Sequence, residues 1–379
     1  MQTTEHVLIA GAGIGGLTAA LTLHEQGLTA TVIDRSDTLQ PLGLGINLLP
    51  HAVRVLSELG LGEALARIAV APTSICYFEP DGTLLFREPR GLQGGYGWPQ
   101  YSVHRGELQM LLLDAVRNRL GAAAVRTGVR AIGFTQPGCE VVTHTTAGDV
   151  TSAFLVGADG IHSTVRKVLH PGDDPLMWSG VTLVRGAIPR EPFLDGHTMA
   201  VVKAHDGVEL VLYPIGAGLT NWILKLPKGS AGPLPGEVDW NEPVNRDEAL
   251  DSVAGWNLPW LNVNDLIGRT KTVLGYPMVD KAPLPTWGTG RVTLLGDAAH
   301  PMYPVGSNGG SQSILDARAL ADQLARAGVD GLRAYEAKRR TETAEVVAAN
   351  RAMYAAEITP QGIADATDRY RTLTRADYV

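Results

Sequence analysis

The stretch HVLIAGAGIGG, near the start of the chain, limits the possible folds more than any other part of the sequence. The apolar run from His6 to Gly11 ends on glycine and predicts a short buried strand. Residues Ile14 to Gln26 predict a helix, with Gly27 at its C-terminal end. ATVIDR, from Ala30 to Arg35, predicts the next strand. This βαβ order implies a parallel sheet with a right-handed crossover, and therefore a Rossmann-like α/β fold.

The glycines between the first strand and the helix predict a dinucleotide site. Gly11, Gly13 and Gly16 form GxGxxG, which allows a tight turn, a close approach to pyrophosphate and close helix–strand packing. Asp34 ends the second strand, where a carboxylate accepts ribose hydroxyls and would repel a 2′-phosphate. The pattern therefore favours FAD or NAD, and the alternative is a structural glycine turn. The expected contacts here are Gly11, Gly13, Ile14, Gly15, Gly16, Asp34 and Arg35.

A second glycine-rich stretch, GDAAHPMYPVGSNGG, begins at Gly296 and distinguishes the two cofactors. It follows a predicted strand, 291–297, and precedes a predicted helix, 311–327. Asp297 is placed to accept a ribityl hydroxyl, and N–H groups near Gly306, Gly309 and Gly310 open the helix toward a reduced flavin. NAD needs no such distal loop, so the sequence predicts FAD. The alternative is a capped strand–helix connection with no ligand.

The middle of the chain has a different pattern. From about Trp178 to Leu284 apolar and polar residues alternate, and a hairpin is expected to turn at Asp206-Gly207. We therefore expect a discontinuous FAD-binding domain (1–71, 101–177 and 286–330), an inserted antiparallel β-sheet substrate domain (72–100 and 178–285) and a C-terminal helical segment (331–379). Within the FAD-binding part, 105–120 and 153–160 predict a helix and a strand. Residues 331–357 predict a long charged helix.

Composition excludes several classes of function. The 379 residues carry a net charge of −7 and no basic block, so nucleic acid is not an expected partner. Cys76 and Cys139 form no CxxC or zinc spacing, which fits a reducing cytoplasm and predicts no metal. No apolar run approaches the roughly 20 residues of a membrane span, and the start lacks the features of a signal peptide.

Three motifs give the chain a resemblance to a known family. GAGIGG, GADGIHSTVR (157–166) and GDAAHPMYPVG (296–306) occur in the order found in the single-component FAD-dependent aromatic hydroxylases typified by p-hydroxybenzoate hydroxylase. Within this family the chain is more similar to the phenazine-modifying hydroxylases. That likeness rests on PLGLGINLLPHAV, EPRG, PQYSVHRGELQM, YPMVDKAPLP and MYPVGSNGGSQSILDA, and it extends into the expected substrate domain.

The resemblance implies further cofactor contacts. Arg105 would contact the FAD phosphates, Val129 the adenine through its backbone, and 44–47 the mobile face of the flavin, with Gly45, Ile46 and Asn47 as contacts. Asp159 and Arg166 would serve the cofactor region. The alternatives are an ion pair of Arg105 with Glu107, a core position for Val129, an ordinary loop turn at 44–47, and a local salt bridge for Asp159 or Arg166.

The resemblance also implies the chemistry. NAD(P)H, expected to be NADH, would reduce FAD, and oxygen trapped as a C4a-hydroperoxide would hydroxylate an electron-rich aromatic substrate, with or without decarboxylation. Pro304 would shape the oxygen pocket beside the flavin. Tyr303, Tyr213, Arg185 and Trp222 are pocket candidates because they lie on predicted strands or loops facing the domain boundary, and the alternative for each is core packing.

Other functions on the same scaffold stay open at this point. They are a flavin-dependent reductase or NADH oxidase, and a non-catalytic flavin-binding module. Flavin-dependent halogenases carry a WxWxIP signature that WNLPW (256–260) does not match. Disulfide reductases would need a CxxC and a second GxGxxG, and the sequence has neither. We expect a monomer or a homodimer.

Overall fold

The computed structural model describes residues 5–172, 175–236, 244–355 and 359–365. Its first layer is a parallel sheet of five strands in the order β19-β12-β1-β2-β8. The strands are β1 (His6–Ala10), β2 (Thr29–Ile33), β8 (Val125–Arg126), β12 (Phe154–Gly157) and β19 (Val292–Leu294). The predicted βαβ opening and the later strands at 153–160 and 291–297 are therefore confirmed, although β2 begins one residue earlier than predicted and the two later strands are half the predicted length or less.

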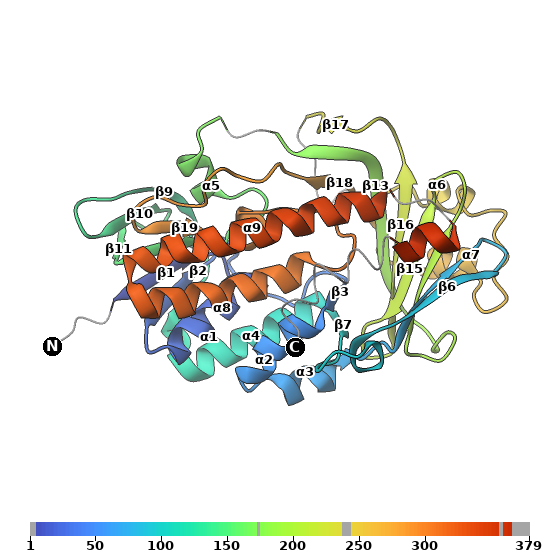
Figure 1. Cartoon of the computed structure of the whole chain (residues 1–379), viewed down its shortest axis with the longest axis horizontal. Helices are drawn as coiled ribbons and strands as arrows, with labels where there is room; N and C mark the ends of the chain where they lie inside the picture. Colours follow the sequence, from blue (N-terminus) through green and yellow to red (C-terminus); the bar gives the residue numbers. More distant parts are fainter. Residues whose placement is uncertain (1–4, 173–174, 237–243, 356–358, 366–379) are drawn as a thin grey trace.

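Helices pack on this sheet and on one another, as Figure 1 shows. The long ones are α1 (Ile14–Glu25), α4 (Arg105–Leu120), α8 (Gly309–Ala327) and α9 (Val329–Tyr354). Glycine lets α1 approach closely: a Cβ at Gly16 would lie 1.9 Å from the Gly11 carbonyl oxygen, and one at Gly15 would lie 2.6 Å from Leu295. The same helix is tied to α8 by a hydrogen bond from Thr22 Oγ1 to the Ala317 carbonyl.

The second layer is a large sheet in the order β17-β13-β16-β15-β14-β5-β6, with β18 paired to β13. These strands are β5 (Ser74–Phe78), β6 (Leu84–Pro89), β13 (Met177–Pro189), β14 (Thr198–Lys203), β15 (Glu209–Pro214), β16 (Leu219–Pro227), β17 (Gly232–Pro233) and β18 (Leu274–Asp280). The predicted hairpin at Asp206-Gly207 is confirmed by the antiparallel pairing of β14 with β15. One pairing differs from the expected antiparallel pattern, because β14 and β5 run parallel.

The two faces of the large sheet have different neighbours. Side chains such as Trp222, Leu224 and Ala200 form a core with α6 (Arg246–Asp251) and α7 (Val263–Arg269), which lie on the outer side of the sheet. The alternate residues of the same strands face inward and line the cavity described below. Because side chains alternate along a strand, one face of each strand packs in the core and the other face lines the cavity.

Smaller elements complete the structure. They are a sheet of β3 (Gly45–Leu48), β7 (Tyr101–His104) and β4 (Ala69–Val70), a sheet of β9 (Ala131–Thr135), β10 (Val141–Thr145) and β11 (Val150–Ser152), the helices α2 (Pro50–Glu58), α3 (Gly62–Ile68) and α5 (Thr164–Leu169), and the short 3₁₀ turns η1 (Gly91–Gly94), η2 (Ala122–Ala124) and η3 (Gly296–Ala298). The predicted helix at 105–120 is confirmed at both ends.

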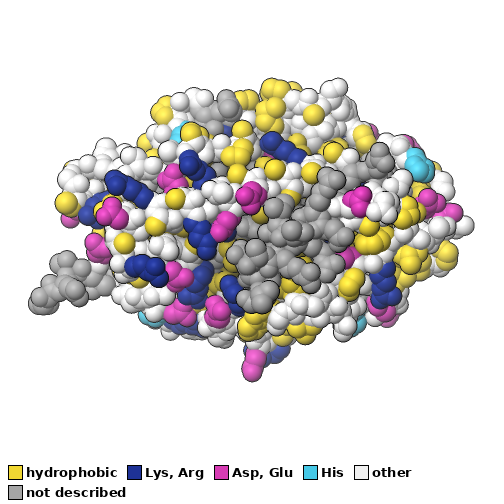
Figure 2. Space-filling view, in the orientation of Figure 1, with side chains coloured by type: hydrophobic (Ala, Val, Ile, Leu, Met, Phe, Trp, Pro, Cys, Tyr) yellow, Lys and Arg dark blue, Asp and Glu magenta, His cyan; other side chains and the backbone are white. Residues whose placement is uncertain are grey.

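The C-terminal helix α9 runs from the parallel sheet toward β18 and β13 (Figure 1), and Arg351 near its end pairs with Asp280 of β18 at 2.6 Å. The expected helix at 331–357 is confirmed as far as Tyr354, and 356–358 lie outside the described residues. On the face drawn in Figure 2, the described acidic and basic side chains are interspersed. In the described ranges, no helix is long and apolar enough to cross a membrane.

Candidate functional site

The sequence motifs meet at one edge of the parallel sheet. The glycine loop follows β1, Asp34 follows β2, Asp159 follows β12 and Asp297 follows β19. These strands are parallel neighbours, so their carboxyl ends lie together, and open α/β sheets bind ligands at that edge. Segments nearly 300 residues apart thus contribute to one site.

The first glycine loop is held by its neighbours and leaves an open space. Asp34 accepts a hydrogen bond from the Ala12 N–H at 2.8 Å, and Gln109 of α4 donates to the Ala12 carbonyl at 2.8 Å. A Cβ added at Gly13 would meet no atom within 4 Å, and Gly13 is the N-cap of α1. An anion placed there would meet the N–H groups and the positive dipole end of that helix.

Residues of the motif GADGIHSTVR (157–166) hold the turn of the motif GDAAHPMYPVG (296–306) in place. The Asp159 carboxylate caps α5 by accepting the Thr164 N–H at 2.7 Å, while its other oxygen is buried without a hydrogen-bond partner among the described residues. The buried Arg166 guanidinium donates to the backbone carbonyls of Ile161, Asp297 and Ala298. Arg166 therefore positions the Asp297 turn through these backbone contacts.

The Asp297 carboxylate faces the cavity and is available as a hydrogen-bond acceptor. No described residue donates a hydrogen bond to it, and the residue is exposed to the cavity. The protein around the carboxylate still desolvates it and raises its pKa, and the charges of His300, Arg105 and Arg166 offset this only in part. A ligand hydroxyl would provide the donor that the protein does not.

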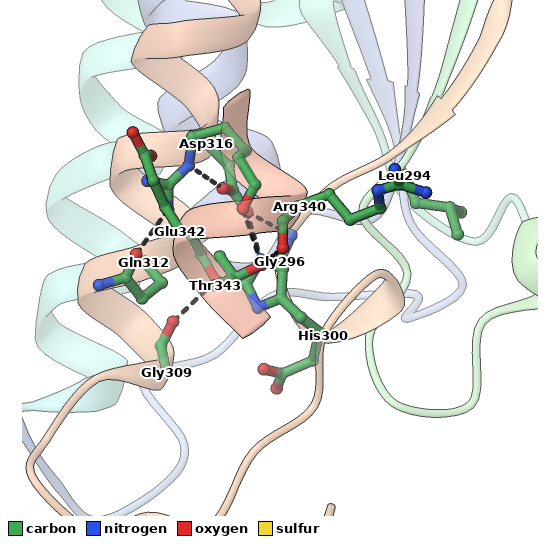
Figure 3. Close-up of polar contacts among 12 residues, drawn as sticks. Leu294, Gly296, His300, Gly309, Gln312, Asp316, Arg340, Glu342 and Thr343 are labelled. Carbon is green, nitrogen blue, oxygen red and sulfur yellow. Dashed lines mark hydrogen bonds and ion pairs between the residues drawn. The ribbon is translucent and has the colours of Figure 1, made fainter. Parts of the chain in front are cut away.

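A buried ionic network holds the turn that carries Asp297, and Figure 3 shows it around Asp316 of α8. The Asp316 carboxylate accepts hydrogen bonds from the Gly296 N–H at 3.0 Å, from His300 Nε2 at 2.6 Å and from Arg339 Nε at 2.7 Å. Arg339 also donates to Gln312 and Glu342. Burial opposes ionisation of Asp316, but His300 and Arg339 outweigh it and lower its pKa to about 2.

The loop before β3 is fixed to the large sheet at Gly45. Its N–H donates to Asn221 Oδ1 at 2.8 Å, and its carbonyl accepts from Tyr213 Oη at 3.0 Å and from Arg185 at 2.8 Å. Burial raises the pKa of Tyr213 to about 12, although Arg185 opposes this, so the phenol stays protonated and donates. A Cβ at Gly45 would come within 2.7 Å of both Asn221 and Tyr213, so only glycine fits between these side chains.

A cavity of about 660 Å³ lies between this loop, the Asp297 turn and the inner face of the large sheet. On one side are residues expected to contact FAD or to lie beside its flavin: Gly45, Ile46, Asn47, Arg105, Asp297, Pro304, Gly306, Gly309 and Gly310. The opposite wall is a broad apolar surface formed by Met199, Val201, Val211, Leu183 and Ile223. The arrangement suits a flat ring placed between a polar cofactor edge and an apolar sheet.

Three charged side chains form the far end of that wall. Lys203, Glu209 and Lys225 lie opposite one another on β14, β15 and β16, and all three face the cavity. Glu209 pairs with Lys203 at 3.1 Å and with Lys225. Burial opposes the charge of Glu209, but the two ammonium groups lower its pKa to about 2. We call these three residues the Lys-Glu-Lys ladder.

The structure separates the four pocket candidates. Tyr213 and Arg185 line the cavity. Trp222 does not: it is fully buried on the outer face of the sheet, where its indole N–H donates to Thr270 Oγ1 at 2.9 Å. Tyr303 is also misplaced, because its side chain packs in the core behind the cavity while the next residue, Pro304, faces the cavity.

Three other candidate contacts are Arg105, Val129 and Arg35. Arg105 begins α4 at the cavity, and no ion pair links it to Glu107. Val129 lies beside Asp34, to whose carbonyl it donates its N–H at 2.8 Å, and Arg35 is exposed next to it. The sequence reasoning missed Asn221 and the Lys-Glu-Lys ladder. The alternation of TNWILKLP was the available signal, since Asn221, Ile223 and Lys225 share one face.

The described residues fit FAD on three independent observations. The space at Gly13 is open in front of a helix N-terminus, an Asp159 oxygen is buried without a partner, and the Asp297 carboxylate faces the cavity without a donor. These features lie along one sheet edge, as a long dinucleotide requires. When bound, FAD reduced by NAD(P)H supplies the activation of molecular oxygen.

Comparison with known proteins agrees with this geometry. A family model described as "FAD binding domain" matches residues 4–245 and 278–350. The chain is 45% identical to the phenazine 1,6-dicarboxylic acid hydroxylase PhzS of Lysobacter antibioticus, over 92% of this chain and 90% of that protein. It is 33% identical to 3-hydroxybenzoate 6-hydroxylase 1 of Aquipseudomonas alcaligenes, over 90% and 86%.

The fold matches solved structures over its whole length. The crystal structure of Klebsiella pneumoniae HpxO complexed with FAD and uric acid superposes with a TM-score of 0.81 and covers 100% of this chain and 92% of that one. The two sequences are 24% identical, so this likeness concerns the fold.

Proposed function

The chain belongs to the FAD binding domain family and is an FAD-dependent aromatic monooxygenase, and we propose that its substrate is a phenazine carboxylate. The observation that carries the proposal is the cavity: an apolar sheet face lies opposite the residues suited to the flavin, and basic side chains outnumber acidic ones around it. The similarity to a phenazine dicarboxylic acid hydroxylase extends over nearly all of the chain, so it includes the strands that form this wall.

The charge of the cavity supports an anionic substrate. Its described lining carries five basic side chains (Arg90, Arg105, Arg185, Lys203 and Lys225) and two acidic ones (Glu209 and Asp297), and the basic side chains remain in excess when Glu88, the partner of Arg90, is counted as well. The protein as a whole has a net charge of −7, so this positive excess is local. A cleft with low-dielectric walls and one dominant sign of charge concentrates ligands of the opposite sign.

Different residues would contact the cofactor and the substrate. We propose that the segments 1–71, 101–177 and 286–330 belong to the cofactor domain and the segments 72–100 and 178–285 to the substrate domain. Within the C-terminal segment 331–379, helix α9 extends to Tyr354. The glycine loop, Asp34, Arg105 and Asp159 hold the dinucleotide half of FAD, and Asp297 with the start of α8 holds the flavin half. Pro304 shapes the space beside the ring, and the apolar wall excludes water and orients the substrate.

The reaction has a defined balance. One atom of O₂ enters the aromatic ring as a hydroxyl, the other leaves as water, and NAD(P)H supplies two electrons. A ring carbon that bears hydrogen releases a proton, and one that bears a carboxylate releases CO₂. The mass of the product distinguishes these two cases.

The test is turnover by the FAD-loaded protein. NADH and NADPH oxidation should accelerate at least tenfold when phenazine-1-carboxylate or phenazine-1,6-dicarboxylate is added, with NADH the better donor, and the product should contain one ¹⁸O atom from ¹⁸O₂. Fast NADH oxidation that no aromatic acid changes, with all the oxygen recovered as hydrogen peroxide, would instead identify an NADH oxidase.

A further inference from the structure

The Lys-Glu-Lys ladder has an unbalanced charge inside the cavity. Two ammonium groups share one carboxylate, and the three side chains are only 10–15% exposed. The acidic group of β18 toward this end, Asp280, is already paired with Arg351. Tyr354 faces the ladder from α9, and burial raises its pKa, so it is neutral. A buried excess charge is costly unless an opposite charge compensates it.

The ladder also has hydrogen-bonding capacity left. A lysine ammonium has three donors, and each of these lysines uses one on Glu209. Glu209 holds the two ammonium groups next to each other, so their remaining donors can converge on a single acceptor with two oxygens. A carboxylate is an acceptor of this kind.

The position of the ladder fixes where such a carboxylate would lie. On β15, Tyr213 contacts the Gly45 loop, Val211 belongs to the apolar wall and Glu209 belongs to the ladder. Alternate residues on one face of a strand are about 6.6 Å apart, so the ladder is roughly 13 Å from the flavin end of the cavity. The intervening space is lined by apolar residues, which suits a flat fused ring system.

From these contacts we infer that Lys203 and Lys225 bind a carboxylate of the substrate at the ring end remote from the flavin. The inference rests on the proposed function and narrows it: the substrate is a flat aromatic acid that binds with its anionic end at the ladder. A dicarboxylate would place one carboxylate in the ladder and the opposite edge of the ring near Gly45. The carboxylate held by the ladder is therefore retained in the product.

The test compares two ligands of the same shape and different charge. Phenazine-1-carboxylate and phenazine-1-carboxamide are titrated into the FAD-loaded protein by equilibrium binding. The wild type should bind the carboxylate about 10- to 100-fold more tightly than the amide, as expected for hydrogen bonds to a charged group. In Lys225→Met, which keeps the aliphatic stem, the ratio should fall below about threefold.

Two matched variants separate this role from a structural ion pair. Glu209→Gln removes the competing carboxylate and should keep or raise the preference for the charged ligand. The double variant Lys225→Met/Glu209→Gln restores one uncompensated ammonium, at Lys203, and should recover part of the preference. A merely structural ladder predicts that all three variants lose thermal stability and leave the ratio unchanged. FAD content and thermal unfolding verify that each variant is folded.

The same experiment distinguishes failure of the subsite from failure of the proposed substrate. If neither phenazine binds, naphthalene-1-carboxylate and its amide take their place, because the ladder recognises charge rather than a particular ring. A preference that depends on Lys225 for naphthalene alone would refute the phenazine assignment and keep the subsite. If no ligand pair shows a preference in the wild type, or Lys225→Met leaves that preference intact, the inference is overturned.

Discussion

Replacing Asp316 by Asn should destabilise the protein and loosen the turn that carries Asp297. The Asp316 carboxylate is fully buried and accepts three hydrogen bonds, two of them from the side chains of Arg339 and His300. Asn keeps the shape but removes the charge, which leaves the Arg339 guanidinium buried with only partial compensation. Removing one partner of a buried ion pair costs about 3–5 kcal/mol. Urea unfolding of the FAD-free protein at pH 7 measures this loss without contributions from the cofactor.

The matched control is Asp322→Asn on the same helix. The Asp322 side chain is 43% exposed and contacts Arg318 at 3.7 Å, a surface pair whose loss costs about 0–1 kcal/mol. FAD affinity should fall in the Asp316 variant and stay unchanged in the control, because only Asp316 binds the Gly296 N–H. Equal effects of the two substitutions, or a loss below 1 kcal/mol at Asp316, would refute the argument.

The pH dependence provides a second measure of the same network. The folded pKa of Asp316 is lowered to about 2 from an unfolded value of 3.8, so its contribution is complete above pH 5 and is lost as the pH falls toward 2. From these two values the loss at pH 3 is about 1 kcal/mol. The Asn variant has no such contribution, so the gap in unfolding free energy between the two proteins should narrow by about that amount between pH 5 and pH 3.

Three further predictions concern other parts of the site. Asp297→Ala should weaken FAD binding about 10- to 100-fold, measured by titrating apoprotein, and unchanged affinity in a folded variant would make Asp297 a structural cap. Gly45→Ala should cost about 1–3 kcal/mol through overpacking against two side chains of the sheet, whereas Gly97→Ala, where a Cβ meets nothing within 4 Å, should be neutral in thermal unfolding. Burial, with the charges of Arg339 and Arg54, lowers the pKa of His51 to about 3, so on acidification His51 is protonated in the unfolded chain at a higher pH than in the folded protein. The free energy of unfolding should therefore fall by about 2 kcal/mol between pH 7.5 and pH 5, and His51→Asn should remove most of this pH dependence in urea unfolding.

The cofactor half of the site was accessible from the sequence because its signals are local. GxGxxG, Asp34 and the Asp297 turn each follow a short buried strand, and parallel strands bring their carboxyl ends together without further information. The direction of β5 relative to β14 had no comparable signal. These strands are about 120 residues apart, and the apolar pattern of a strand does not encode whether its neighbour runs parallel.

The misplacement of Trp222 has a specific cause. In β16 both faces are buried, one against α6 and α7 and the other against the cavity, so apolar residues occur at successive positions. Alternation identifies a buried face only where the other face is polar. The polar residues Asn221 and Lys225 were the better guide, since a polar side chain on a buried strand needs a partner or a ligand.

The large sheet carries both the residues that fix the cofactor loop and the residues that would anchor the substrate. At one end, Tyr213 and Asn221 fix the Gly45 loop, and at the other end the Lys-Glu-Lys ladder presents its charge. Both sets lie on the same paired strands, so the distance between cofactor loop and substrate anchor is set by the rise of a strand rather than by a flexible loop. Substitutions at the Gly45 end should therefore lower turnover for every substrate alike. Substitutions in the ladder should alter the choice among substrates by charge, because the reacting edge of the ring depends on which end is anchored.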